Sequence, residues 1–87
     1  MIEIETTTLY RRRFKKLTPQ LRRLVIEREK IFVANPFDHR LGTHKLHGKR
    51  KEEWAYWVDY SYRVAFLFLG NNKVLYTEVG THDELYR

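Results

Sequence analysis

The sequence predicts an α+β domain in which an N-terminal pair of helices packs on one face of a small, mainly antiparallel sheet. Three observations predict this class. The chain begins with apolar and acidic residues alternating at period two, continues with apolar residues at helical spacing, and then carries three runs rich in aromatic and β-branched residues. The predicted order is β-α-α-β-β-β with a short C-terminal helical turn, all in a single domain over residues 1–87.

The N-terminal part of the chain predicts one strand and two helices. Residues 2–7 begin with alternating isoleucine and glutamate, which is typical of a half-buried strand. From Tyr10 onward, apolar residues recur every three or four positions and predict a first helix. Thr18 suits an N-cap and Pro19 suits the first helical position, so a second helix is predicted to begin there. The Asn-Pro-Phe sequence at residues 35–37 should end it.

The C-terminal part predicts three strands after a polar connection over residues 35–52. The aromatic and β-branched runs that predict these strands lie at residues 54–60, 62–69 and 73–79. Between the last two, Gly-Asn-Asn at residues 70–72 tolerates positive φ and predicts a tight hairpin. The near-continuous apolar run over residues 64–69 predicts a central strand covered on both faces.

Composition limits the class of protein. Hydrophobic residues make up 43% of the 87 residues and aromatic residues 15%, which is enough apolar surface for a core. The absence of cysteine excludes disulfides and thiolate metal sites and favours an intracellular setting. The N-terminus lacks the apolar core of a signal peptide, and no apolar run reaches membrane-spanning length. We therefore expect a cytoplasmic protein that does not contact membranes.

The positive charge is unevenly distributed along the chain. The sequence has 17 lysines and arginines against 11 acidic residues, a net charge of +6, and residues 9–51 hold 14 of the basic residues but only 3 of the acidic ones. Such asymmetry favours a face that contacts a polyanion such as a nucleic acid. The alternative is an ordinary solvated helix surface.

Two segments resemble a known family. The sequence YRVAFLFLGNNKVLYTEVGTHDELY at residues 62–86 resembles the C-terminal half of the RelE/ParE toxin superfamily, and HKLHGKRKEEW at residues 44–54 is similar to the segment that leads into that sheet. The resemblance to RelE/YoeB/YafQ-like members implies the toxin of a type II toxin-antitoxin system. Such a toxin cleaves mRNA in the ribosomal A site without metal or cofactor and is silenced by a cognate antitoxin.

Two other functions stay open. Some relatives in the superfamily poison DNA gyrase instead of cleaving mRNA, so the resemblance alone does not decide the target. A non-catalytic nucleic-acid-binding module on the same scaffold would also agree with the basic charge.

Metal-free RNA cleavage needs a base for the 2′-hydroxyl, a cation for the phosphorane and an acid for the leaving 5′-oxygen. Arg63 is the candidate cation because it is the lone basic residue in an apolar strand; alternatively it pairs with Asp59 or Glu78 on the sheet surface. His82 is the candidate acid, since the resemblance places a functional histidine or arginine at this strand end. Alternatively, His82 only begins a terminal helix whose Thr-x-x-Glu capping pattern starts at Thr81.

The general base has three candidates, His47, Glu53 and His44, all in or next to the polar connection. Trp57 stands where one branch of the family, the YafQ-like toxins, has a histidine. His44 and His47 could also suggest a metal site, but their spacing is not the helical one of zinc helices and no cysteine is present, so no metal is predicted.

The remaining site predictions concern RNA contacts. Basic residues should bind RNA phosphates, and an aromatic residue in the position of a family aromatic should stack on a base. These residues are Arg12, Arg13, Lys16, Lys45, Lys49, Arg50, Lys51 and Tyr86. Gly80 is predicted to let the backbone turn at the strand end, so that His82 faces the phosphate. Strand alternation separates Trp54, Tyr56 and Tyr60 from Trp57, and one of the two sets should be free to stack on RNA bases or on an antitoxin helix.

Overall fold

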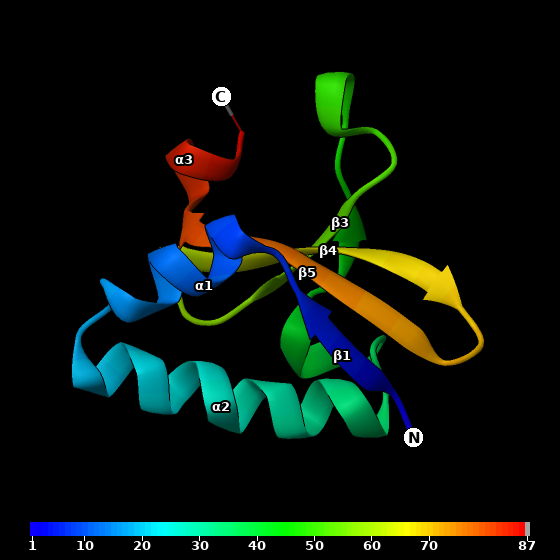
Figure 1. Ribbon diagram of the computed structural model, residues 1–87, viewed down its shortest axis with the longest axis horizontal. Coiled ribbons are helices and arrows are strands. Elements are labelled where there is room, and N and C mark those ends of the chain that lie inside the picture. Colours follow the sequence, from blue (N-terminus) through cyan, green and yellow to red (C-terminus); the bar gives the residue numbers. More distant parts are fainter. Residues whose placement is uncertain (87) are drawn as a thin grey trace.

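The structure is a computed structural model that describes residues 1–86, and it confirms the α+β class (Figure 1). Its helices and strands, within these residues, are β1 (Glu3–Thr6), α1 (Thr8–Lys15), α2 (Pro19–Ala34), the 3-10 helix η1 (His39–Leu41), β2 (His44–Lys45), the 3-10 helix η2 (Gly48–Arg50), β3 (Trp54–Trp57), β4 (Tyr62–Gly70), β5 (Lys73–Thr81) and α3 (His82–Leu85). Within the same residues, no helix is both long and apolar enough to cross a membrane.

The five strands found in residues 1–86 form one sheet in the order β1-β5-β4-β3-β2. Strand β1 runs parallel to β5, and every other pairing is antiparallel, as predicted for a mainly antiparallel sheet. The polar connection predicted over residues 35–52 holds short elements that the sequence did not predict. That segment contains η1, η2 and the edge strand β2, which pairs His44 with Ala55. Two residues are too few to show strand periodicity, so the sequence carried no signal for β2.

Both predicted helices are present, and threonine caps set where they begin. The side chain of Thr7 accepts a hydrogen bond from the backbone N–H of Tyr10, so α1 begins two residues before the predicted position. Thr7 therefore ends the first strand earlier than expected. Thr18 caps α2 in the same way and Pro19 is its first residue, as predicted.

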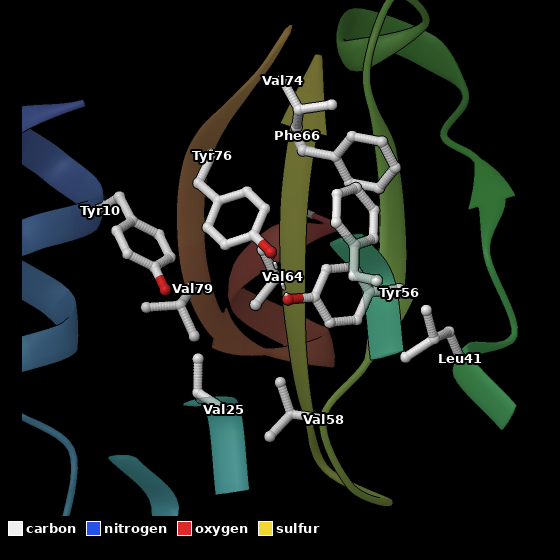
Figure 2. Packing of buried hydrophobic residues seen from close by; sticks show 11 residues of the cluster. Tyr10, Val25, Leu41, Tyr56, Val58, Val64, Phe66, Val74, Tyr76 and Val79 are labelled. Carbon is white, nitrogen blue, oxygen red and sulfur yellow. Dashed lines mark hydrogen bonds between the residues drawn. The ribbon is translucent and has the colours of Figure 1, made fainter. Parts of the chain in front are cut away.

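The main core lies between the sheet and helices α1 and α2 (Figure 2). Phe32 of α2 is fully buried, and its ring lies 5.0 Å from that of Tyr56 and 4.9 Å from that of Phe66. The hydroxyls of Tyr56 and Tyr76 satisfy each other at 2.9 Å inside this apolar cluster. Aromatic side chains thus fill the space that a pair of short helices leaves above a small sheet.

Strand β4 is the central strand, but the prediction that it is covered on both faces holds only for its first half. Ala65 and Phe66 are fully buried, whereas Phe68 and Leu69 are 41% and 46% exposed. Helix α3 has four residues and covers only one end of the second face of the sheet. The hairpin after β4 has positive φ at all three residues of the segment 70–72, as predicted.

A β-bulge in β5 controls which side chains reach the second face. Ala65 pairs with Glu78 but the next residue of β4, Phe66, pairs with Tyr76, so one extra residue is inserted in β5. Because of this shift, Tyr76 and Val79 both pack in the main core, while Glu78 lies on the opposite face. Figure 1 shows α3 and the segment with η2 projecting from the sheet on the side away from α2.

Candidate active site

A small apolar cluster attaches α3 to the second face of the sheet. Leu85 of α3 is buried with Leu46, Ala55 and Ala65, and the two alanines are direct partners across β3 and β4. Alanine side chains allow a helix to approach the sheet closely. The cluster therefore fixes the position of α3, whose first residue is His82.

The capping pattern predicted from Thr81 and Glu84 is present. The Thr81 hydroxyl accepts from the backbone N–H of Glu84, and Glu84 Oε1 accepts from the backbone N–H of Thr81 at 2.8 Å. Gly80 has a role other than the one predicted, because its φ is not in the left-handed region. A Cβ at Gly80 would lie 2.8 Å from Glu84 Oε1 and 3.3 Å from Leu85 Cδ1. The glycine provides space for α3 and its cap, and no unusual backbone turn depends on it.

Arg63 and His82 line one pocket of about 570 Å³, which is bounded as well by the segment that precedes β4. The Arg63 Nη1 donates to the backbone carbonyls of Asp59 at 2.7 Å and Tyr60 at 2.9 Å. Within residues 1–86, no protein acceptor binds its Nε or Nη2. One edge of the guanidinium is thus fixed by the loop, and the other can bind an anion.

The alternative pairing of Arg63 with Asp59 or Glu78, both within the described residues, is not observed. Asp59 Oδ1 accepts instead from the backbone N–H groups of Ser61 and Tyr62, which closes the turn before β4. Glu78 binds other arginines on the second face. Arg63 therefore keeps its charge available at the pocket.

Tyr86 connects His82 to His44. The Tyr86 ring lies 4.3 Å from the His82 ring and is nearly parallel to the His44 ring at 6.2 Å. Its hydroxyl is hydrogen-bonded to His44 Nε2, and His44 Nδ1 lies 2.9 Å from the Gly42 carbonyl. A carbonyl can only accept, so Nδ1 carries the proton and Nε2 is the basic nitrogen.

The hydroxyl of Tyr86 stays protonated at neutral pH. Partial burial raises the pKa of Tyr86 and outweighs the opposing effect of the Arg63 and Arg50 charges. The phenol is therefore a hydrogen-bond donor toward His44 Nε2. Tyr86 therefore contacts His82 on one side and His44 on the other.

Glu53 lies in a network of ion pairs. Arg50 binds both of its carboxylate oxygens, at 2.8 and 2.9 Å, and the Thr77 hydroxyl also donates to Oε1. Burial raises the pKa of Glu53, but the hydrogen bonds from Arg50 and Thr77 outweigh it, so this pKa lies below the usual value. A carboxylate that is so stabilised in its charged form is a weak base.

The same network holds two of the arginines that the sequence suggests as RNA ligands. Arg50 also donates to Glu78 at 2.9 Å and to the Leu85 carbonyl at 3.2 Å. Arg13 of α1 binds Glu84 at 2.6 Å and lies 3.4 Å from Glu78. Both arginines therefore attach α3 to the body of the protein.

The other predicted residues lie at the edges of this region. Exposed His47 precedes η2 and lines a hollow of about 270 Å³ beside Tyr86, away from the pocket of Arg63. Arg12 and Lys16 line a groove of about 490 Å³ between α1 and the start of α3. The remaining predicted lysines are exposed, and they are Lys45, Lys49 and Lys51. In the described part of the chain, no three His, Cys, Asp or Glu side chains gather as a metal site would require.

The chain is similar to known proteins in its fold and not in its sequence. No family model matches the chain, and no curated protein matches it. Solved structures do match: YafQ from E. coli strain BL21(DE3) has a TM-score of 0.80 with 14% identity over 100% of both chains. The YoeB/ParE toxin from Agrobacterium tumefaciens has a TM-score of 0.79 with 10% identity, over 93% of this chain and 99% of that one. This chain has the RelE/ParE toxin fold.

A chain of the archaeal RelE-RelB complex from Pyrococcus horikoshii OT3 has the same fold, with a TM-score of 0.73 and 13% identity over 92% of this chain and 93% of that one. The resemblance that residues 62–86 indicate is thereby confirmed at the level of the fold. At identities this low, a shared fold does not establish a shared activity, so the chemistry has to be argued from the residues of this chain.

Sequence reasoning gave no role to two arginines beside the pocket. Arg28 and Arg40 lie with Trp57, Tyr60 and Arg63 around a second hollow of about 370 Å³. Arg28 comes from the middle of α2 and Arg40 from η1, so no local pattern connects them with the strand residues. Only Arg63 and the strand aromatics Trp57 and Tyr60 had pointed to this part of the RelE/ParE fold from the sequence.

Proposed function

We propose that this chain is the toxin of a type II toxin-antitoxin system and acts as a metal-independent endoribonuclease on mRNA at the ribosome. The observation that carries the proposal is the pocket that His82 lines together with Arg63, whose guanidinium has one free edge within the described residues. The fold supports it, because the matching structures include the E. coli DinJ-YafQ toxin-antitoxin complex and the RelE-RelB complex. A cognate antitoxin is accordingly the expected protein partner.

The cleavage step depends on the contacts that Tyr86 makes with His44 and with His82. The substrate 2′-hydroxyl gives its proton to the Tyr86 oxygen while the Tyr86 proton moves to His44 Nε2. The 2′-oxygen then attacks phosphorus, and Arg63 stabilises the charge of the phosphorane through its Nε and Nη2. His82 protonates the departing 5′-oxygen, which leaves a 2′,3′-cyclic phosphate and a 5′-hydroxyl.

His44 is the base that the geometry favours among the three candidates. Glu53 is bound at both oxygens by Arg50 and has a lowered pKa. His47 lies in a separate hollow that Arg63 does not line. His44 alone has a ring nitrogen fixed as an acceptor and a contact that leads to the pocket of Arg63.

The exposed cations supply the affinity for RNA in this proposal. Arg12 and Lys16 in the groove beside α1 and Lys49 within η2 are solvent-exposed, so they can neutralise phosphates and release counterions. Arg13 forms ion pairs with Glu78 and Glu84, and Arg50 forms ion pairs with Glu53 and Glu78. The sequence treated all of these residues alike.

The test is single-turnover cleavage of an mRNA on purified ribosomes, read by primer extension. Arg63→Ala should cleave on the order of a hundredfold more slowly than the wild type, the usual scale for losing a transition-state charge. Exposed Lys73 at the distant end of β5 provides the matched control, and Lys73→Ala should cleave at the wild-type rate. A zinc-selective chelator, which spares the magnesium that ribosomes need, should leave cleavage unchanged.

The proposal fails if Arg63→Ala is folded and cleaves as fast as Lys73→Ala. It also fails if the wild type cleaves no mRNA but inhibits DNA gyrase in a supercoiling assay. Loss of cleavage in the chelator with recovery on adding zinc would show that the metal-free mechanism is wrong.

A further inference from the structure

A second hollow adjoins the candidate active site on the far side of Arg63. It has a volume of about 370 Å³, and Arg63 and Tyr60 line both it and the His82 pocket. Trp57 forms its aromatic wall, and Trp57 is the cross-strand partner of Arg63. An anion bound to Arg63 in the first pocket would therefore have this hollow next to it.

We propose that this hollow binds one nucleobase of the RNA substrate, stacked on Trp57, next to the phosphate that Arg63 holds. The inference rests on the proposed function and adds to it a determinant of sequence preference. The volume lies within the range of about 300–1,000 Å³ that is typical of small-ligand sites. Aromatic faces bind bases of every sequence by stacking, and arginine planes add to that attraction.

Trp57 is exposed, yet it is held in place. Its side chain is 45% exposed, which is unusual for tryptophan. The ring packs directly on Gly42, which has φ of +56° and no side chain; a Cβ there would lie 2.6 Å from Trp57 Cε3. A ring that is already fixed loses little conformational entropy when a base stacks on it.

The charges around the hollow favour a nucleic acid over an acidic protein segment. Three arginines line it against one acid, Asp59, whose Oδ1 already accepts from two backbone N–H groups. Arg40 is held by Asp38 and Arg28 by the Val58 carbonyl, so both guanidinium planes are fixed at the wall. Flat cations and an aromatic ring around a narrow hollow suit a flat base attached to a phosphate.

The experiment follows the fluorescence of Trp57. The chain has two tryptophans, so Trp54→Phe leaves Trp57 as the only one. The probes are 2′-deoxy trinucleotides, which cannot be cleaved by attack of a 2′-hydroxyl, and three matched trinucleotides that each carry one abasic position. We expect saturable quenching by the complete trinucleotide, and binding about tenfold weaker or more for one abasic probe only.

The matched control is Trp57→Phe, in which Trp54 is the remaining tryptophan and should not report binding. Trp57→Ala should also cleave a reporter mRNA more slowly and with an altered preference at one nucleotide position. Quenching that is absent, or equal for all three abasic probes, would overturn the proposal. Trp57→Ala that weakens binding of the antitoxin but not of trinucleotides would overturn it in favour of a protein contact.

These outcomes separate the nucleobase site from the proposed function. If trinucleotides quench the fluorescence in a base-dependent way but the wild type cleaves no mRNA, the proposed nuclease function is wrong and the nucleobase site is retained. If the wild type cleaves mRNA, Trp57→Ala cleaves it with the same rate and preference, and no quenching is seen, the nucleobase site is wrong and the nuclease function is retained.

Discussion

Replacing Arg50 should damage the fold, whereas replacing its neighbour Lys49 should not. Arg50 is 21% exposed and donates to Glu53, to Glu78 and to the Leu85 carbonyl. Lys49 is exposed in the same 3-10 helix, so it is a matched control for charge and position. From the sequence alone, the two residues are equivalent members of a basic run.

The size of the effect follows from what Arg50→Ala leaves behind. Glu78 is 5% exposed and would keep only the contact with Arg13 at 3.4 Å. Removing one partner of a buried ion pair costs about 3–5 kcal/mol, and the surviving Arg13 contact should reduce this to about 2–3 kcal/mol in the free energy of unfolding. Lys49→Ala should change it by about 0.5 kcal/mol or less, as surface substitutions usually do.

Urea unfolding measures this difference. For a chain of this size the urea dependence is about 1 kcal/mol per molar, so Arg50→Ala should lower the midpoint by about 2–3 M. RNA binding should respond in the opposite way. Lys49→Ala should reduce the slope of log affinity against log salt concentration by the amount expected for about one lost phosphate contact, whereas folded Arg50→Ala should leave this slope unchanged. Equal midpoints for the two variants would refute the assignment of Arg50 to the ion-pair network.

Three further predictions test the site and its supports. His82→Ala and His82→Gln should both cleave mRNA on the order of a hundredfold more slowly in single turnover while binding ribosomes normally, because neither can deliver a proton; a folded His82→Ala with wild-type cleavage would contradict the role of acid. Gly42→Ala should lower the free energy of unfolding by about 1–3 kcal/mol and shift the Trp57 fluorescence, since a side chain there is strained and meets the indole; unchanged emission in the Trp54→Phe background would contradict this. Because the pKa of Glu53 is lowered in the folded state, its carboxylate stabilises the fold at pH values above its ordinary pKa of 4.5, and this contribution is lost as the pH falls through the lowered pKa. Glu53→Gln should therefore flatten the acid side of a plot of stability against pH, measured by urea unfolding.

Local patterns account for most of the fold that the sequence predicts. Thr18 and the capping pair Thr81 and Glu84 act through bonds to residues three positions away, so their effect is visible in the sequence. The hairpin at residues 70–72 is local in the same sense. Strand β2 and the bulge in β5 depend on how each strand is registered against its neighbour in the sheet, which no local pattern encodes, and the sequence did not reveal them.

The candidate site divides in the same way. Arg63 was predicted because it is the lone basic residue in an apolar strand, and His82 because the resemblance to the family places a functional histidine or arginine where the next strand ends. The bond between His44 and Tyr86 joins residues 42 positions apart, and the pair of Arg13 with Glu84 joins residues 71 positions apart. No periodicity encodes such contacts, so the choice of base and the structural role of Arg13 required the three-dimensional structure.

Helix α3 shows why the arginine network matters for chemistry. A helix of four residues is far too short to be stable alone, so its position depends on Leu85 in the apolar cluster, on the capping box, and on Arg13 and Arg50. His82 at its start therefore depends on two arginines that contact no substrate in the proposed mechanism. Neutralising Arg13 or Arg50 would lower cleavage by displacing His82 even if RNA binding were unaffected. Loss of activity in such variants is consequently no measure of RNA affinity, which only the exposed cations such as Lys49 can report.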